Sequence, residues 1–154
     1  MALFQREVAA AVRVPVFLSS LSQIPFLHAI TRRRVGIITA DADALTPGHF
    51  DALGISADIP LAVGDMKAQK EFREAILEER GTLDSSLIEQ EVVEVAIDLA
   101  RQYPDIGALL LECSDLPPYA HAVQAHTRLP VFDFITMIRY VASSLLHRPY
   151  DGFM

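Results

Sequence analysis

The stretch Val35-Gly36-Ile37-Ile38-Thr39 decides the fold that this sequence predicts. It is short, rich in β-branched residues and bounded by polar residues, which is typical of a strand buried on both faces of a sheet. A second apolar run of the same kind spans Ile106 to Leu111, and helical patterns lie between the two runs. Strands that alternate with helices indicate a parallel sheet covered by helices on both faces.

Weaker patterns extend this α/β prediction over most of the chain. Three further strands are expected at 16–18, 59–63 and 129–134. Expected helices share apolar spacings of three and four residues, and they cover 2–12, 21–31 (a short helix or turns), 46–53, 67–79, 84–103, 117–126 and 135–147. Thr46 is expected to cap one of these helices, and Asp84 or Ser85 another. The predicted sheet therefore has five parallel strands flanked by helices.

The composition excludes several classes of protein. The chain has 154 residues, of which 51% are hydrophobic and 21% charged, so it has the material for a core and is not wholly disordered. A net charge of −7 argues against general nucleic-acid binding, and the basic run Arg32-Arg33-Arg34 is interpreted as a solvated helix end. No apolar run reaches the ~18 residues of a membrane span. We therefore expect a soluble, cytoplasmic protein with no nucleic-acid or membrane partner.

The single cysteine, Cys113, is the sharpest chemical feature. One cysteine excludes an internal disulfide framework, and His121 and His126 are five residues apart, which is the wrong spacing for a metal pair on one helix face. Cys113 follows a buried strand and precedes the helix expected at Pro117, whose first amides would lower the pKa of the thiol. A small residue that fills a strand end is an equally good interpretation from position alone. Asp115 would either orient this thiol or cap the helix.

Two segments resemble a known family. The sequence from Leu109 to Pro117, followed by Leu129 to Asp133, resembles the second cysteine motif of the aspartate/glutamate/hydantoin racemase superfamily. Val35 to Thr39 resembles the strand that opens the second domain of those enzymes, and Val14 to Phe17 the strand that closes the first. The resemblance implies two flavodoxin-like α/β domains and racemisation without a cofactor or metal. One thiol would then act on each face of the α-carbon.

The resemblance also assigns roles to residues. Cys113 matches the thiol of the second domain. Asp115 departs from the family pattern, since many members carry a histidine there; Cys113 and Asp115 are the expected catalytic residues. Ser114 matches the hydroxyl residue after the cysteine, and it could instead cap the turn. Thr39 and Asp43 lie where relatives bind a carboxylate, although the negative charge of Asp43 suits an amino group better. The expected substrate is a small carboxylate or an amino acid.

The same resemblance predicts an incomplete two-domain architecture. The first cysteine would precede Met1, so residues 1–33 are expected to be the remnant of a first domain. Residues 34–134 would form the second domain, and residues 135–154 a helix and tail that pack back on the first. A complete single domain is the alternative. Unpartnered apolar surface in residues 1–30 predicts a homo-oligomer.

The expected activity is amino-acid racemisation, impaired in this chain by the absence of a second cysteine. A single-thiol decarboxylase of the arylmalonate type is one alternative, because protonation from one face needs one donor. A non-catalytic α/β remnant that binds a small acid is the other.

Overall fold

A four-stranded parallel sheet forms the centre of the computed structural model, which describes residues 1–147, 149 and 152. The strand order is β2-β1-β3-β4, with β1 at Arg34–Thr39, β2 at Leu61–Asp65, β3 at Ile106–Leu111 and β4 at Val131–Phe132. Ile37 of β1 pairs with Val63 of β2 on one side and with Leu110 of β3 on the other. The predicted α/β class with a parallel sheet is confirmed.

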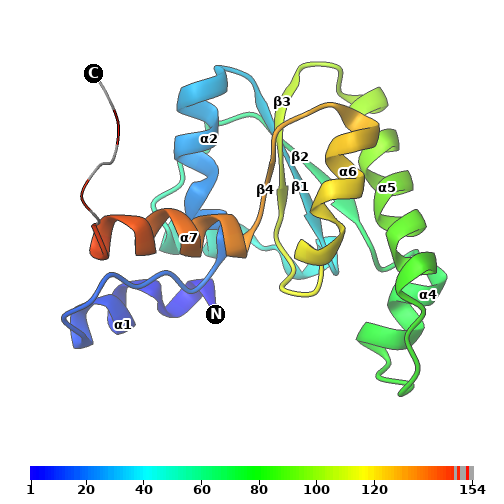
Figure 1. The fold of residues 1–154 in the computed structure, drawn as a ribbon, viewed down its shortest axis with the longest axis horizontal. Coiled ribbons are helices and arrows are strands. Elements are labelled where there is room, and N and C mark those ends of the chain that lie inside the picture. The colour runs from blue at the N-terminus through cyan, green and yellow to red at the C-terminus, as the bar shows by residue number, and fades with distance from the viewer. Residues whose placement is uncertain (148, 150–151, 153–154) are drawn as a thin grey trace.

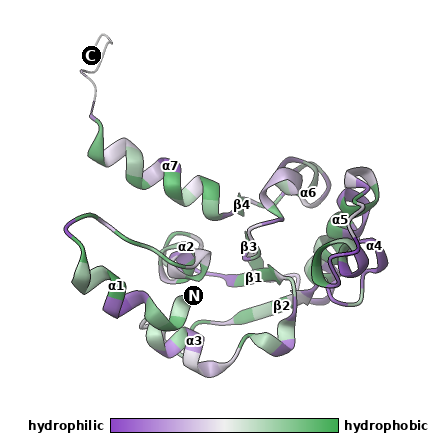
Figure 2. Ribbon diagram, turned by 90° about the horizontal axis from the view of Figure 1, so that it is seen from below, coloured by the Kyte–Doolittle hydropathy of each residue, from purple (hydrophilic) through white to green (hydrophobic). Residues whose placement is uncertain are grey.

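Helices cover both faces of this sheet, and each face has its own core (Figures 1 and 2). The helices are α1 (Gln5–Ala11), α2 (Ile24–Thr31), α3 (Pro47–Ala52), α4 (Lys70–Phe72), α5 (Ser85–Gln102), α6 (Ala120–Thr127) and α7 (Phe134–Leu145). Against α5 and α6 the sheet buries Ile38, Leu109 and Leu111, and against α2 it buries Val35, Ile37 and Leu110. Alternate residues of β1 and β3 thus serve opposite cores, as the pleat of a strand requires.

Asp84 begins α5 as predicted. Its side chain accepts hydrogen bonds from the backbone amides of Ser86 (2.9 Å) and Leu87 (3.2 Å). These amides have no partner within the helix, so the carboxylate satisfies them and complements the helix dipole. Thr46 likewise stands immediately before α3, whose bounds agree with the expected 46–53.

Gly64 lets β2 approach α5 closely. A Cβ atom at this position would lie 2.8 Å from Cγ1 of Val95. Real Cβ contacts are not that short, so the close packing of helix on strand depends on glycine here.

The prediction of a strand at 16–18 is wrong, because no strand forms there. Residues 15–17 belong to no strand or helix, and the side chain of Gln5 takes the place of a neighbouring strand. Its Nε2 donates to the carbonyl oxygen of Val16 (2.8 Å), and its Oε1 accepts from the amide of Leu18 (2.8 Å). The polar backbone is satisfied by one side chain rather than by a ladder, so the sheet has four strands in the described residues.

Several other elements differ from the sequence prediction in extent, and the strand expected at 59–63 lies at Leu61–Asp65. The helix expected over 67–79 begins at Lys70 and continues from Arg73 to Leu77 as a π-helical segment. The helix expected from Pro117 begins as a 3-10 turn, Pro117–Tyr119, ahead of α6. The strand expected at 129–134 shortens to Val131–Phe132, because Asp133 already caps α7 by accepting from the amide of Thr136 (2.6 Å).

Residues assigned to the two predicted domains pack together in the structure. Leu21, Ile24 and Leu27 share a buried cluster with Val35 and Leu110. The first turn of α7 touches the same N-terminal part of the chain, since the rings of Phe17 and Phe134 meet edge to face at 5.6 Å. The division at residue 33 stays a prediction, and most of the predicted tail lies outside the described residues. No helix in the described part of the chain is both long and apolar enough to cross a membrane.

Candidate active site

The site lies where β1 and β3 end side by side. Thr39 is the last residue of β1, and Glu112 and Cys113 directly follow β3. The backbone amide of Glu112 donates to the carbonyl oxygen of Ile38 (2.8 Å), which holds the two strand ends together. In open parallel sheets this edge is the usual place for ligands.

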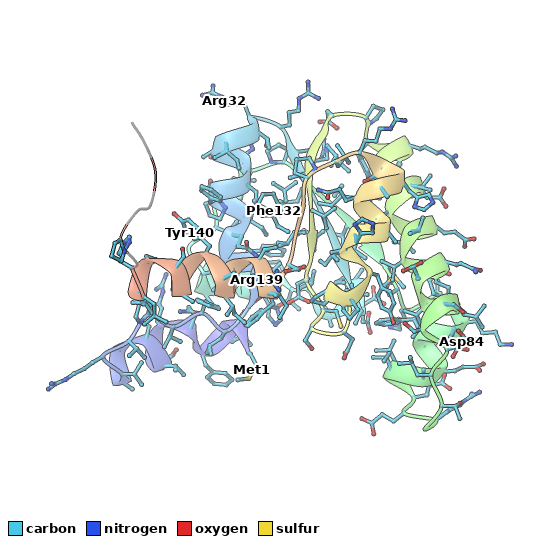
Figure 3. All side chains as sticks on the ribbon, viewed as in Figure 1. Met1, Arg32, Asp84, Phe132, Arg139 and Tyr140 are labelled. Atoms are coloured by element: carbon cyan, nitrogen blue, oxygen red, sulfur yellow. The ribbon has the colours of Figure 1, made fainter. Side chains whose placement is uncertain are left out.

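A cavity of about 500 Å³ opens at this edge. Among its lining residues are Ala2, Leu18, Ser19, Thr39, Asp41, His49, Glu112, Cys113, Ser114 and Phe134. Met1 also lines it, and Figure 3 shows Met1 at the opposite end of the sheet from Arg32. The basic run of the sequence therefore lies far from the cavity.

Cys113 is half-buried in this cavity, and its surroundings favour the neutral thiol. Burial raises the pKa of Cys113 to about 11, and the negative charges of Asp115 and Glu112 act in the same direction. Sγ of Cys113 lies 3.6 Å from Oδ2 of Asp115, to which it donates a hydrogen bond. The expected lowering of the thiol pKa is therefore wrong. The segment after Cys113 is not an α-helix with free amides but a 3-10 turn that opens with two prolines.

Glu112 forms the polar floor of the cavity. Oε1 of Glu112 accepts from the hydroxyl of Ser19 (3.4 Å), and Oε2 accepts from the hydroxyl of Thr39 (3.2 Å). Both hydroxyl residues are buried, with 6% and 3% of their surfaces exposed. The carboxylate is thus held by residues from two other parts of the chain.

Asp41 and Asp43 share one cation at the rim. Nζ of Lys67 lies 2.9 Å from Oδ2 of Asp41 and 3.3 Å from Oδ2 of Asp43. The pKa of Asp41 is lowered, chiefly by its hydrogen bond with Lys67, and the pKa of Lys67 is raised by both carboxylates. The negative charge of Asp41 is therefore balanced at the rim itself.

The structure brings together most of the residues that the sequence singled out. Cys113, Ser114 and Thr39 line the cavity, and Asp115 contacts the thiol rather than capping a helix. Asp43 is exposed, pairs with Lys67 and does not line the cavity. The described residues hold no group of three His, Cys, Asp or Glu side chains arranged for a metal ion.

Sequence reasoning missed Ser19, Asp41 and Glu112. Glu112 stands next to Cys113 after the same strand, and this adjacency was a usable signal. Ser19 gave no signal in the sequence, because it lies 93 residues from Glu112, whose carboxylate it binds.

A larger hollow of about 630 Å³ lies between α6 and α7 and shares Ser114 with the cavity. His121, Gln124 and Arg139 line it, but no thiol does. We place the candidate site in the smaller cavity because it holds the thiol of Cys113 beside the fixed carboxylate of Glu112.

Similar proteins have a different activity from the one expected. No family model matches the chain. Dimethylsulfoniopropionate lyase of Durusdinium sp. clade D is 31% identical over 97% of this chain and 54% of its own length. Dimethylsulfoniopropionate lyase 6 of Emiliania huxleyi is also 31% identical, over 97% of this chain and 41% of its own length. The chain thus spans about half the length of the curated relatives it matches.

Solved structures show the fold alone. A crystal structure of arylmalonate decarboxylase aligns with a TM-score of 0.54 and 17% identity, over 84% of this chain and 56% of the other. The unliganded form of that enzyme gives the same TM-score at 18% identity, over 87% and 57% of the two chains. The fold expected from the family resemblance is therefore confirmed.

The expected amino-acid racemase activity is wrong. The relatives that match nearly all of this chain are named as lyases, which contradicts both the racemase interpretation and the isomerase class. The decarboxylase alternative gains support at the level of fold only. The cysteine motif marks a thiol at a strand end, and one fold with such a thiol can host several reactions.

Proposed function

We propose that this chain belongs to a lyase that acts on dimethylsulfoniopropionate, with Cys113 as the base. The similarity to lyases of that name over 97% of the chain carries the proposal. The position of Cys113, in a cavity at the carboxyl ends of β1 and β3, supports it.

The reaction needs one base. Dimethylsulfoniopropionate is a propionate that carries a dimethylsulfonium group, so it has one negative and one positive charge. The thiolate of Cys113 removes a proton from the carbon next to the carboxylate, and the electrons of that C–H bond form the carbon–carbon double bond. The C–S bond breaks with its electrons on sulfur, which gives neutral dimethyl sulfide and acrylate. The proton on Cys113 then passes to water.

A thiol with a raised pKa suits this step. A proton next to a carboxylate is weakly acidic, and a base of high pKa removes it more readily once the base is ionised. Few Cys113 side chains are ionised at neutral pH, because the pKa is about 11. A cation bound beside the sulfur would lower this pKa and increase the ionised fraction.

The other polar groups suit the rest of the substrate. Ser114 lines the cavity beside Cys113 and offers a hydroxyl to the substrate carboxylate. The hydroxyl of Thr39 donates to Glu112, so we assign Thr39 a positioning role. Asp115 would hold the thiol proton when Cys113 is at rest.

The test measures release of dimethyl sulfide. The purified chain is incubated with dimethylsulfoniopropionate, and the headspace is analysed by gas chromatography. We expect release by the wild type and a loss of about a thousandfold or more in Cys113→Ser, because removal of the group that acts on the reacting bond removes most of the rate. Circular dichroism and thermal unfolding confirm that the variant is folded.

A reversible chemical block provides the control. Cys113 is the only cysteine of the sequence, so methyl methanethiosulfonate modifies this thiol alone. Activity should disappear on modification and return with dithiothreitol. No release by the wild type, or full release by Cys113→Ser, would contradict the proposal.

A further inference from the structure

We propose that Glu112 recognises the positive charge of the substrate and restricts the cavity to zwitterions that carry a sulfonium or quaternary ammonium group. This inference rests on the proposed function, and it identifies the residue that selects the substrate class. The evidence is the placement of the carboxylate, the charges around it and its effect on the neighbouring thiol.

The Glu112 carboxylate is fixed in place. Hydrogen bonds from Ser19 and Thr39 occupy one lone pair on each oxygen, and the backbone amide bonds to Ile38 of the adjacent strand. Both hydroxyl donors are neutral, so they orient the carboxylate without cancelling its charge. A charge oriented in advance loses little conformational freedom when it binds a ligand.

Glu112 is the acidic lining residue of this cavity that lacks a cation. Asp41 is paired with Lys67 at the rim, whereas Glu112 takes part in none of the ion pairs between described residues. A half-buried carboxylate without a counter-ion attracts a cation more strongly than an exposed one, because less water screens it. The substrate's sulfonium group would supply the missing positive charge.

The apolar part of the lining fits the same group. Leu18 and Phe134 border the cavity, and the ring of Phe134 is held edge to face against Phe17. Methyl groups on an onium centre would pack against these side chains while the charge faces the carboxylate. A primary ammonium group would leave N–H donors without acceptors where it faced Leu18 and Phe134.

Cation binding at Glu112 would also activate Cys113. The charge of Glu112 is one cause of the high thiol pKa, so a cation that neutralises this charge favours the thiolate. Binding of the cation and loss of the thiol proton then assist each other, as linkage requires. The base would ionise when the correct substrate is present.

The test compares two inhibitors that have the same shape and different charges. In 3-(trimethylammonio)propanoate a cationic nitrogen stands near the position of the sulfonium, and in 4,4-dimethylpentanoate a neutral carbon with the same three methyl groups does. In the wild type we expect the cationic compound to inhibit dimethyl sulfide release at a concentration roughly tenfold or more below that of the neutral one. In Glu112→Gln this preference should fall to near unity, and KM for dimethylsulfoniopropionate should rise by a similar factor.

Glu89→Gln is the matched control. Glu89 is exposed on α5, and its replacement removes the same charge from the chain while the inhibitor preference stays unchanged. A second readout is the thiolate absorbance of Cys113 near 240 nm. Its midpoint should move to lower pH in Glu112→Gln and stay in place in Glu89→Gln, because only Glu112 acts on the thiol.

The outcomes separate this inference from the proposed function. No release of dimethyl sulfide by the wild type refutes the proposed function. Release with equal inhibition by the two compounds refutes the role of Glu112 and leaves the lyase activity intact. The comparison of inhibitors in the wild type needs no variant, so it decides the matter even if Glu112→Gln does not fold.

Discussion

Cys113 keeps its proton to high pH because it is half-buried and faces acidic neighbours. We expect alkylation by iodoacetamide to be slow at pH 8, because only the thiolate reacts. Asp115→Asn removes a charge that raises the pKa of Cys113, so the thiol should then react severalfold faster. Asp98→Asn, which removes a charge from an exposed position of α5, should leave the rate unchanged. A rate in Asp115→Asn equal to or below that of the wild type would contradict this assignment.

The same thiol makes stability depend on pH. Its pKa rises from the ordinary value of 9.0 to about 11 on folding, so the folded protein binds the proton more tightly than the unfolded chain. The resulting contribution to the free energy of unfolding is complete below pH 9 and is lost as the pH rises through 11. Urea unfolding between pH 8 and 11 should show this decline in the wild type. The decline in stability should be smaller in Cys113→Ser. Identical curves of stability against pH for the two proteins would contradict this contribution of the thiol.

At the scale of elements, the start of α5 depends on the Asp84 side chain. Asp84→Ala removes the acceptor of two backbone amides and should lower the free energy of unfolding by about 1 kcal/mol. Asp98→Ala removes a carboxylate from the same helix, where it only forms an exposed pair with Arg101, and should change stability little. Equal effects of the two substitutions in urea titrations would show that the cap contributes nothing specific.

The contact between β2 and α5 depends on the absence of a side chain at Gly64. Gly64→Ala places a methyl group 2.8 Å from Cγ1 of Val95, so we expect a loss of ~1–3 kcal/mol through overpacking. Val95→Ala in the same chain makes room for this methyl group. The double variant should therefore be destabilised by less than the sum of the two single changes, and an additive result would argue against a direct clash.

At the scale of the whole molecule, an apolar hollow of about 480 Å³ lies between α2 and α7. Phe26 and Tyr140 stack at its edge with ring centroids 6.3 Å apart, yet 51% and 72% of their surfaces are exposed. We propose that this surface mediates the expected self-association, since large exposed apolar patches mark contacts between proteins.

Light scattering over a range of concentrations tests this proposal. The wild type should show a mass that rises with concentration, and Phe26→Ser combined with Tyr140→Ser should weaken association by about tenfold or more. Leu83→Ser removes an exposed apolar side chain just before α5 and should leave association unchanged. A wild type that stays a monomer at high concentration would contradict the proposal.

Several features could be predicted from local sequence because local physics decides them. Val35 to Thr39 and Ile106 to Leu111 are apolar enough to require burial on both faces, so they predict buried strands of a parallel sheet. Asp84 and Thr46 mark helix starts because a short polar side chain satisfies backbone amides a few residues away. Cys113 could be singled out because it is the one cysteine of the sequence and directly follows a buried strand.

Other features needed the tertiary structure because they depend on residues far apart in the sequence. Gln5 satisfies the backbone of Val16 and Leu18, so a segment with the pattern of a strand never joins the sheet. The pKa of Cys113 is raised because the thiol is partly buried, and local sequence does not encode burial. The shift is therefore opposite to the lowered pKa expected from the sequence. Glu112 becomes a fixed charge only when Ser19 and Thr39 reach it. The sequence by itself thus determined the α/β class, most of the elements and the position of the thiol. Folding decided the electrostatics, because charge interactions depend on distance in space and on the exclusion of water.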